Sequence, residues 1–83
     1  MNRIYKYKLQ LAAKQDISAN IVKALRVDVQ DNYLCLWAEV APESTVALAT
    51  ILCVCTGQEA PTNAQYINTI QNDGYVWHFY IVT

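Results

Sequence analysis

The chain has 83 residues, a length that suits a single domain spanning residues 1–83. Its net charge is −1 and its six basic residues are scattered, which argues against a nucleic-acid polymer as partner. Charged residues make up 16% of the chain, against about 25% in a typical soluble domain. So small a core cannot hide the remaining apolar surface, and a surplus of this kind usually marks an interface, so we expect a homo-oligomer.

The N-terminal stretch, residues 3–11, alternates between polar and apolar side chains in the way that is typical of a half-buried strand. The apolar face of this strand would hold Tyr5, Tyr7, Leu9 and Leu11. The outer face is basic, which also protects a terminal strand against sheet-to-sheet association. From residue 12 to residue 20 the alternation is lost, which predicts a polar loop with at most one helical turn.

Residues 21–40 carry the clearest supersecondary signal, because two alternating runs flank the turn pair Asp31-Asn32. A two-residue turn pairs Gln30 with Tyr33, and a one-residue slip would mix the two faces. The further pairs would be Val29 with Leu34, Val27 with Leu36 and Leu25 with Ala38 on the apolar face, then Asp28 with Cys35 and Arg26 with Trp37 on the other. This register predicts a cation–π contact between Arg26 and Trp37.

Residues 45–56 are apolar on both faces of the strand that their β-branched content predicts. Such a strand is central, and its second face needs a cover, which in so small a domain we expect to be a second subunit. Cys53 and Cys55 would share one face about 7 Å apart, too far for an easy disulfide. We therefore expect reduced thiols, and no metal site, because C-x-C with one distant histidine lacks four ligands.

A polar loop, residues 56–65, precedes the C-terminal hairpin, in which Asp73-Gly74 is a strong turn signal. The turn allows a two-residue loop, with Asn72 opposite Tyr75, or a three-residue loop with a different register. Trp77 and His78 are adjacent in the last strand and would point to opposite faces.

These elements predict a mainly β protein: a small antiparallel sheet or half-barrel of about six strands joined by hairpins, with at most one short helical turn. The most apolar run is too short to span a bilayer, and the N-terminus has no signal-peptide pattern. We therefore expect a cytoplasmic protein that does not bind membranes.

Chemistry-bearing motifs are scarce in this sequence. It offers no carboxylate pair and no glycine-rich phosphate loop. The only histidine, His78, could meet Cys53 or Cys55 in space, but these cysteines lie in the most apolar strand, which favours inert thiols. We therefore expect a protein that is not an enzyme and has no catalytic residues, no cofactor and no metal. The frequent aromatic residues indicate either core and interface positions or a binding cleft that stacks on a planar ligand.

An ordered series of short motifs extends over almost the whole chain. The series comprises Y-K-Y at 5–7, V-Q at 29–30, C-L-W-A-x-V at 35–40, T-G at 56–57, Y-I-x-T-x-Q at 66–71 and V-W-H at 76–78. It resembles a family of short phage and prophage domains of unknown function. That family tends to have G-T-G-H in the central loop, where this chain has Cys55-Thr56-Gly57-Gln58, so that Gln58 offers only a neutral polar group in place of a histidine.

The resemblance implies a virus-encoded, cytosolic protein directed against host defence. From it we expect a protein that sequesters, without cleavage, a nucleotide-derived immune signal such as a cyclic ADP-ribose-like molecule or a cyclic oligonucleotide. The alternative is a small inhibitor or adaptor that binds a host protein, or a virion component. The side chains expected to bind the ligand are Tyr5, Tyr7, Arg26, Trp37, Thr56, Gln58, Trp77 and His78, with phosphates meeting Arg3, Lys6 or Arg26.

Overall fold

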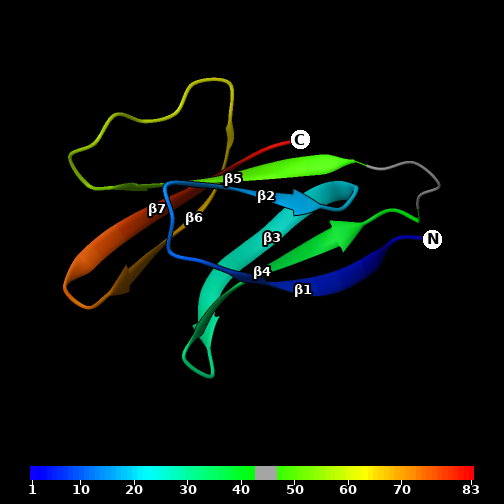
Figure 1. Ribbon diagram of the computed structural model, residues 1–83, viewed down its shortest axis with the longest axis horizontal. Helices are drawn as coiled ribbons and strands as arrows, with labels where there is room; N and C mark the ends of the chain where they lie inside the picture. The colour runs from blue at the N-terminus through cyan, green and yellow to red at the C-terminus, as the bar shows by residue number, and fades with distance from the viewer. Residues whose placement is uncertain (43–46) are drawn as a thin grey trace.

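Two antiparallel sheets enclose the hydrophobic core in the computed structural model of the chain (Figure 1), which describes residues 1–42 and 47–83. Sheet A has the strand order β1-β4-β3, and sheet B has the order β2-β5-β7-β6. The strands are β1 (Arg3–Leu9), β2 (Lys14–Ser18), β3 (Ile21–Gln30), β4 (Tyr33–Val40), β5 (Leu48–Cys55), β6 (Gln65–Asn72) and β7 (Tyr75–Val82). The predicted fold class is confirmed, with seven strands and no helix in the described ranges.

The strand that sequence reasoning missed is β2, which lies where a polar loop with at most one helical turn was predicted. Its side chains alternate between exposed and half-buried, with Gln15 and Ile17 turned inward. A strand so short and polar is held mainly by its partner, and β2 pairs along its whole length with β5, from Lys14 opposite Leu52 to Ser18 opposite Leu48.

A corner between β1 and β2 ends the first strand earlier than the alternation predicted. The side chain of Gln15 binds both backbone groups of Gln10: Oε1 accepts from the Gln10 N–H at 3.0 Å, and Nε2 donates to the Gln10 carbonyl at 2.7 Å. The first strand therefore stops at Leu9, and Leu11, which was predicted to lie on its apolar face, is 59% exposed.

Both predicted hairpins form around two-residue turns. The pair Asp31-Asn32 has φ values of 53° and 67°, and the pair Asp73-Gly74 has 52° and 80°. Positive φ at both central positions is the type I′ turn, whose twist matches that of the flanking strands. The second turn aligns Asn72 with Tyr75, which decides between the two loop lengths that the sequence allowed. Among the described strands, the other neighbours within each sheet are not consecutive in the chain, so they are not joined by tight hairpins.

The register of the first hairpin follows the prediction from the turn as far as Arg26 opposite Trp37 and then departs from it. A β-bulge between Ala24 and Arg26 makes Ala38 pair with Ala24, so the predicted pair of Leu25 and Ala38 is wrong. The extra residue in a bulge has no partner on the opposite strand, and Leu25 is 39% exposed.

The two sheets join where β3 and β6 lie side by side. Asn68, which follows a bulge in β6, binds the backbone of Val27 through its side-chain amide. Its Oδ1 accepts from the Val27 N–H at 2.7 Å, and its Nδ2 donates to the Val27 carbonyl at 2.8 Å. Val27 is fully buried, so this amide provides partners for backbone groups that would otherwise lack them. The strands β1 and β2 are not paired with each other in the described sheets, which leaves a half-barrel.

β5 is a central strand, as its two apolar faces predicted, and lies between β2 and β7. Its inner face, formed by Ala49, Ile51 and Cys53, is buried in the core. Its outer face is only partly covered, since Leu48 is 61% exposed. Thr45 and Val46, the start of the predicted strand, lie outside the described residues. All three cysteines are free, and burial raises the pKa of the Cys53 thiol to about 11, which fits the expected unreactive thiols.

Candidate ligand-binding cleft

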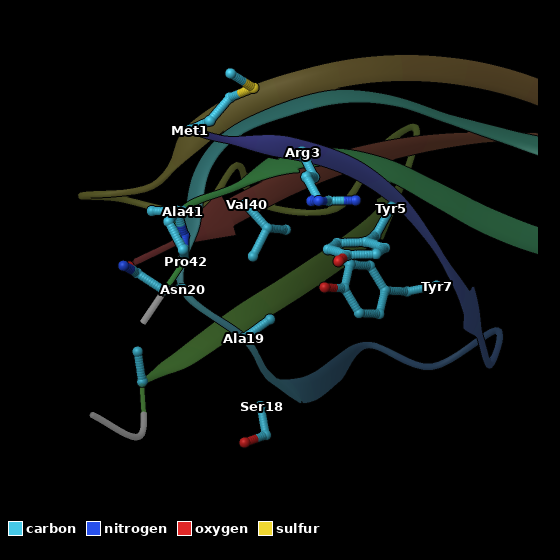
Figure 2. Close-up of a pocket in the computed structure, with 11 residues that line it drawn as sticks. Met1, Arg3, Tyr5, Tyr7, Ser18, Ala19, Asn20, Val40, Ala41 and Pro42 are labelled. Atoms are coloured by element: carbon cyan, nitrogen blue, oxygen red, sulfur yellow. The ribbon is translucent and has the colours of Figure 1, made fainter. Parts of the chain in front are cut away.

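A hollow of about 480 Å³ lies where the edge strand β1 faces the turn between β2 and β3 (Figure 2). We call it the β1 cleft. It lies at the open side of the half-barrel, and its volume falls within the range of small-molecule sites. Three groups of side chains line most of the cleft. One wall has Arg3, Tyr5 and Tyr7, the other has Ser18, Ala19 and Asn20, and one end has Val40, Ala41 and Pro42.

Strand alternation places Arg3, Tyr5 and Tyr7 on one side of β1. Their partners across the sheet are residues of β4 that also face inward, such as Ala38 opposite Tyr5 and Leu36 opposite Tyr7. Figure 2 shows the three side chains extending from β1 into the same space. Tyr7 packs against the core, whereas Tyr5 is 49% exposed, so the row runs from the core toward solvent.

Backbone hydrogen bonds hold the opposite wall in place. The Ala19 N–H donates to the Ile17 carbonyl at 3.1 Å within the turn. The Ala41 N–H donates to the Asn20 carbonyl, also at 3.1 Å, and so ties the exit of β4 to the same turn. The two walls of the cleft therefore belong to different sheets but are joined at one end.

The electrostatics of the β1 cleft favour an anion. Arg3 supplies a permanent positive charge in a planar fork of donors. Burial, and to a lesser extent the neighbouring Tyr5, raises the pKa of Tyr7 above its ordinary value, so its hydroxyl stays a neutral donor at physiological pH. Of the described residues that line the cleft, none is Asp, Glu, His or Cys. The arrangement therefore suits binding better than acid–base chemistry.

A second polar cluster surrounds His78 on the outer face of sheet B. The Thr56 hydroxyl lies 2.9 Å from Nε2, and the Thr69 hydroxyl lies 2.9 Å from Nδ1. The Thr69 hydroxyl also bonds to that of Tyr66 at 2.5 Å. Both ring nitrogens are thus engaged by hydroxyl groups, which fits a histidine that helps to hold the surface together.

The Thr56-Gly57-Gln58 loop is a turn that Gln58 closes. Its N–H donates to the Cys55 carbonyl at 3.1 Å, and its side-chain oxygen accepts from the Cys55 N–H at 2.7 Å. Gly57 has a φ of 100°, a left-handed conformation that a glycine adopts without strain. The oxygen of Gln58 is therefore already bound within the loop.

The structure distributes the predicted ligand-binding residues over separate places. Tyr5 and Tyr7 line the β1 cleft, and Thr56, Gln58 and His78 surround a shallow hollow at one end of sheet B. Arg26 and Trp37 lie opposite each other on the outer face of sheet A, and Trp77 packs against the core. Trp77 and His78 do point to opposite faces, as their adjacency predicts. Hence no single pocket of one chain gathers all eight side chains.

Arg26 does not stack on Trp37 as predicted. It forms an ion pair with Asp28 at 3.0 Å instead. In the part of the chain that the structure describes, the cation that lies over an aromatic ring is Lys8, 3.9 Å from the centre of the Tyr33 ring. A carboxylate two residues away on the same face competes better for the guanidinium than the ring does.

Arg3 is the cation that the structure adds to the tyrosines. It was one of three candidates for a phosphate contact, and its odd-numbered position placed it on the same side of β1 as Tyr5 and Tyr7. The wall formed by residues 18–20 had no such signal, because it depends on how a turn of sheet B packs against sheet A.

The structure also bears on metal sites and on membrane-spanning helices. No group of three or more His, Cys, Asp or Glu in residues 1–42 and 47–83 is placed to hold a metal ion. Across those ranges there is also no helix long and apolar enough to cross a membrane.

A family model for a domain of unknown function, DUF7352, matches residues 1–83. The chain belongs to this family. No curated protein and no solved structure matches the chain. Membership therefore brings no activity, ligand or source with it.

Proposed function

We propose that this domain binds a small anionic ligand with a planar part, of the nucleotide type, in the β1 cleft and does not cleave it. The observation that carries the proposal is the row of Arg3, Tyr5 and Tyr7 on one wall of a hollow of about 480 Å³. None of the described lining residues is Asp, Glu, His or Cys.

Each of these side chains has a distinct role in the proposal. The Arg3 guanidinium binds a phosphate through two parallel hydrogen bonds. The half-exposed ring of Tyr5 stacks on a base, and the Tyr7 hydroxyl donates a hydrogen bond to the ligand. Val40 and Pro42 provide apolar contact at the end of the cleft.

In its wider form the proposal is that the protein is phage-encoded, acts in the host cytoplasm and sequesters a nucleotide-derived immune signal. Cyclic ADP-ribose-like molecules and cyclic oligonucleotides combine phosphates with planar bases, as the cleft requires. Support for the viral setting comes from the motif series described above. Sequestration needs tight binding without turnover, which suits a site whose described lining holds no Asp, Glu, His or Cys.

A thermal-shift and calorimetric panel of cyclic nucleotides and ADP-ribose derivatives tests this proposal. We expect one ligand class to raise the melting temperature, and mass spectrometry to show that heat-released ligand is unchanged. Arg3→Gln should weaken binding about 10- to 100-fold, the value of a charge-assisted hydrogen bond. Arg26→Gln is the matched control, because Arg26 lies on the outer face of sheet A and should leave affinity unchanged. No shift with any compound, or a ligand of altered mass, would contradict the proposal.

A second candidate function is a small inhibitor or adaptor that binds a host protein, or a virion component. The observation that favours it is the partly exposed apolar outer face of sheet B, on which Leu48 is 61% and Tyr66 52% exposed. Pull-down of one defined host or virion protein, lost in Leu52→Glu but kept in Arg3→Gln, would favour this role over ligand binding.

A further inference from the structure

The outer face of sheet B carries apolar side chains on three neighbouring strands, interrupted by Thr50 and bordered by the polar cluster around His78. Its position follows from the register, because the alternate residues Ile51, Cys53, Phe79 and Ile81 are buried inward. Leu52 lies opposite Tyr80, and Tyr80 lies opposite Tyr66. The residues of this surface, which we call the sheet B face, are Leu48, Leu52, Val54, Tyr66, Tyr80 and Val82.

The sheet B face has an apolar centre and a polar rim, which is the anatomy of a protein interface. Leu52, Val54 and Tyr80 are half-buried at the centre, whereas Leu48 is 61% exposed. The rings of Tyr66 and Tyr80 meet edge to face at 5.5 Å, and the Thr69 hydroxyl fixes Tyr66 through a hydrogen bond. Aromatic side chains that are already held in one orientation lose little entropy when a partner covers them.

The chain as a whole exposes more surface than a compact monomer of its mass, by about the area that one interface covers. The chain exposes 5692 Å², whereas a compact monomer of 9.4 kDa is expected to expose about 5,000 Å². The surplus of about 700 Å² is close to the roughly 800 Å² that each partner buries in a standard interface. The molecule is also flat, with extents of 41 × 31 × 16 Å, so that each broad face is a large part of its surface.

The charge on the sheet B face suits a second copy of the chain and argues against a strongly charged partner. On the outward side of the four described strands of sheet B, the charged residues are Lys14 and Asp16, both on β2. Their charges are opposite, so two copies of this face meet without an excess of like charge. A nucleic acid or a strongly charged protein would instead need a face of one sign.

We infer that the sheet B face is the interface of a homodimer, in which sheet B of one copy packs on sheet B of a second copy. Two sheets packed in this way lie about 10 Å apart, and the second sheet provides the cover that β5 lacks within one chain. Arg3, Tyr5 and Tyr7 belong to sheet A, so dimerisation and ligand binding can be tested with different variants.

Light scattering and sedimentation of the full chain test the inference. We expect a particle of about 19 kDa, twice the 9.4 kDa of one chain, that dissociates on dilution. Leu52→Glu puts a carboxylate at the centre of the sheet B face and should raise the dissociation constant at least about 10-fold. Leu48→Glu should act in the same direction and is safe for folding, because Leu48 is 61% exposed in one chain. The matched control is Leu11→Glu, which is 59% exposed but lies outside the face and should leave the dimer intact.

Circular dichroism must show that each variant is folded before its mass is interpreted. A wild-type chain that stays monomeric at about 100 µM, where even a weak dimer forms, would overturn the inference. So would a dimer that survives both substitutions on the face, or one that Leu11→Glu disrupts equally. If the monomeric chain instead binds lipid vesicles or a host protein through Leu52, the face belongs to that other partner.

Discussion

The outward faces of the two sheets differ in almost every side chain they present. The outer face of sheet A carries six charged residues, Lys6, Lys8, Lys23, Arg26, Asp28 and Glu39, whereas that of sheet B is mainly aliphatic and aromatic. On sheet A several of these charges have partners: Lys6 binds Gln30 at 2.8 Å, and Arg26 binds Asp28 at 3.0 Å. On sheet B most of the corresponding positions are apolar, apart from Lys14, Asp16, Thr50 and the cluster around His78.

In each sheet, the neighbouring strands decide whether the outer face of the central strand is covered. In sheet A the central strand β4 turns Cys35 outward, yet Cys35 is only 1% exposed, because its partners across the sheet are Lys8 and Asp28. Long charged side chains can cover apolar groups with their stems while the charge stays in water. In sheet B the partner of Leu48 across the sheet is Ser18 of the short strand β2, whose small side chain leaves Leu48 61% exposed. The outer face of β5 is therefore left for a partner.

The largest effect on stability is expected where the Asn68 side chain joins β6 to β3 and so holds the two sheets together. Asn68→Ala leaves the N–H and the carbonyl of the buried Val27 without partners, and should lower the free energy of unfolding by about 2–4 kcal/mol. Asn68→Asp keeps the acceptor for the Val27 N–H but sets a carboxylate oxygen against the Val27 carbonyl, so it should also be less stable than the wild type. Asn72→Ala, at the exposed end of β6, is the control and should change stability by less than about 0.5 kcal/mol. Urea unfolding measures the free energy of unfolding of all three variants. Equal losses of stability at residues 68 and 72 would show that the Asn68 hydrogen bonds do not hold the sheets together.

A smaller effect is expected where a charged side chain covers sheet A. Lys8→Ala removes the contact with the Tyr33 ring, worth about 0.5–1 kcal/mol at an exposed site, and uncovers Cys35. The rate at which Cys35 is alkylated should rise, whereas Lys6→Ala should leave it protected. Mass spectrometry after timed alkylation measures this, with the half-buried Cys55 as internal reference. A Cys35 that stays unreactive in Lys8→Ala would mean that the lysine is not its cover.

The smallest effect is the acid dependence of the ion pair on sheet A. The hydrogen bond from the Val29 N–H, and then that from Arg26, hold the pKa of Asp28 below its ordinary 3.8. A carboxyl group whose pKa is lowered by folding stabilises the protein above the unfolded pKa, and this contribution is lost as pH falls below it. The free energy of unfolding should therefore fall less between about pH 5 and pH 2.5 in Asp28→Asn than in the wild type. The difference between the two proteins should lie within the roughly 0–1 kcal/mol that is typical of exposed ion pairs. Parallel stability curves for the two proteins would contradict this.

The candidate site was only partly predictable from the chain. Alternation alone places Tyr5 and Tyr7 on one side of β1, and Arg3 shares that side. It could not show that Trp77 packs in the core while Arg26 lies on the far side of sheet A, because both depend on which sheet each strand joins. Nor could it place the wall formed by residues 18–20, which comes from across the half-barrel.

The sequence by itself determined the two hairpins and the central position of β5. The turn pairs Asp31-Asn32 and Asp73-Gly74 favour positive φ in consecutive residues. The alternation of side chains between the two faces of a strand can be recognised within a few residues of sequence. Only the tertiary structure decided that residues 14–18 form a strand, that Leu25 falls in a bulge, and that Asn68 joins the sheets. Those features depend on partners far away in the chain, such as Leu52 for Lys14 and Val27 for Asn68. Their free energy comes from pairing and burial rather than from local preference, so a local pattern cannot reveal them.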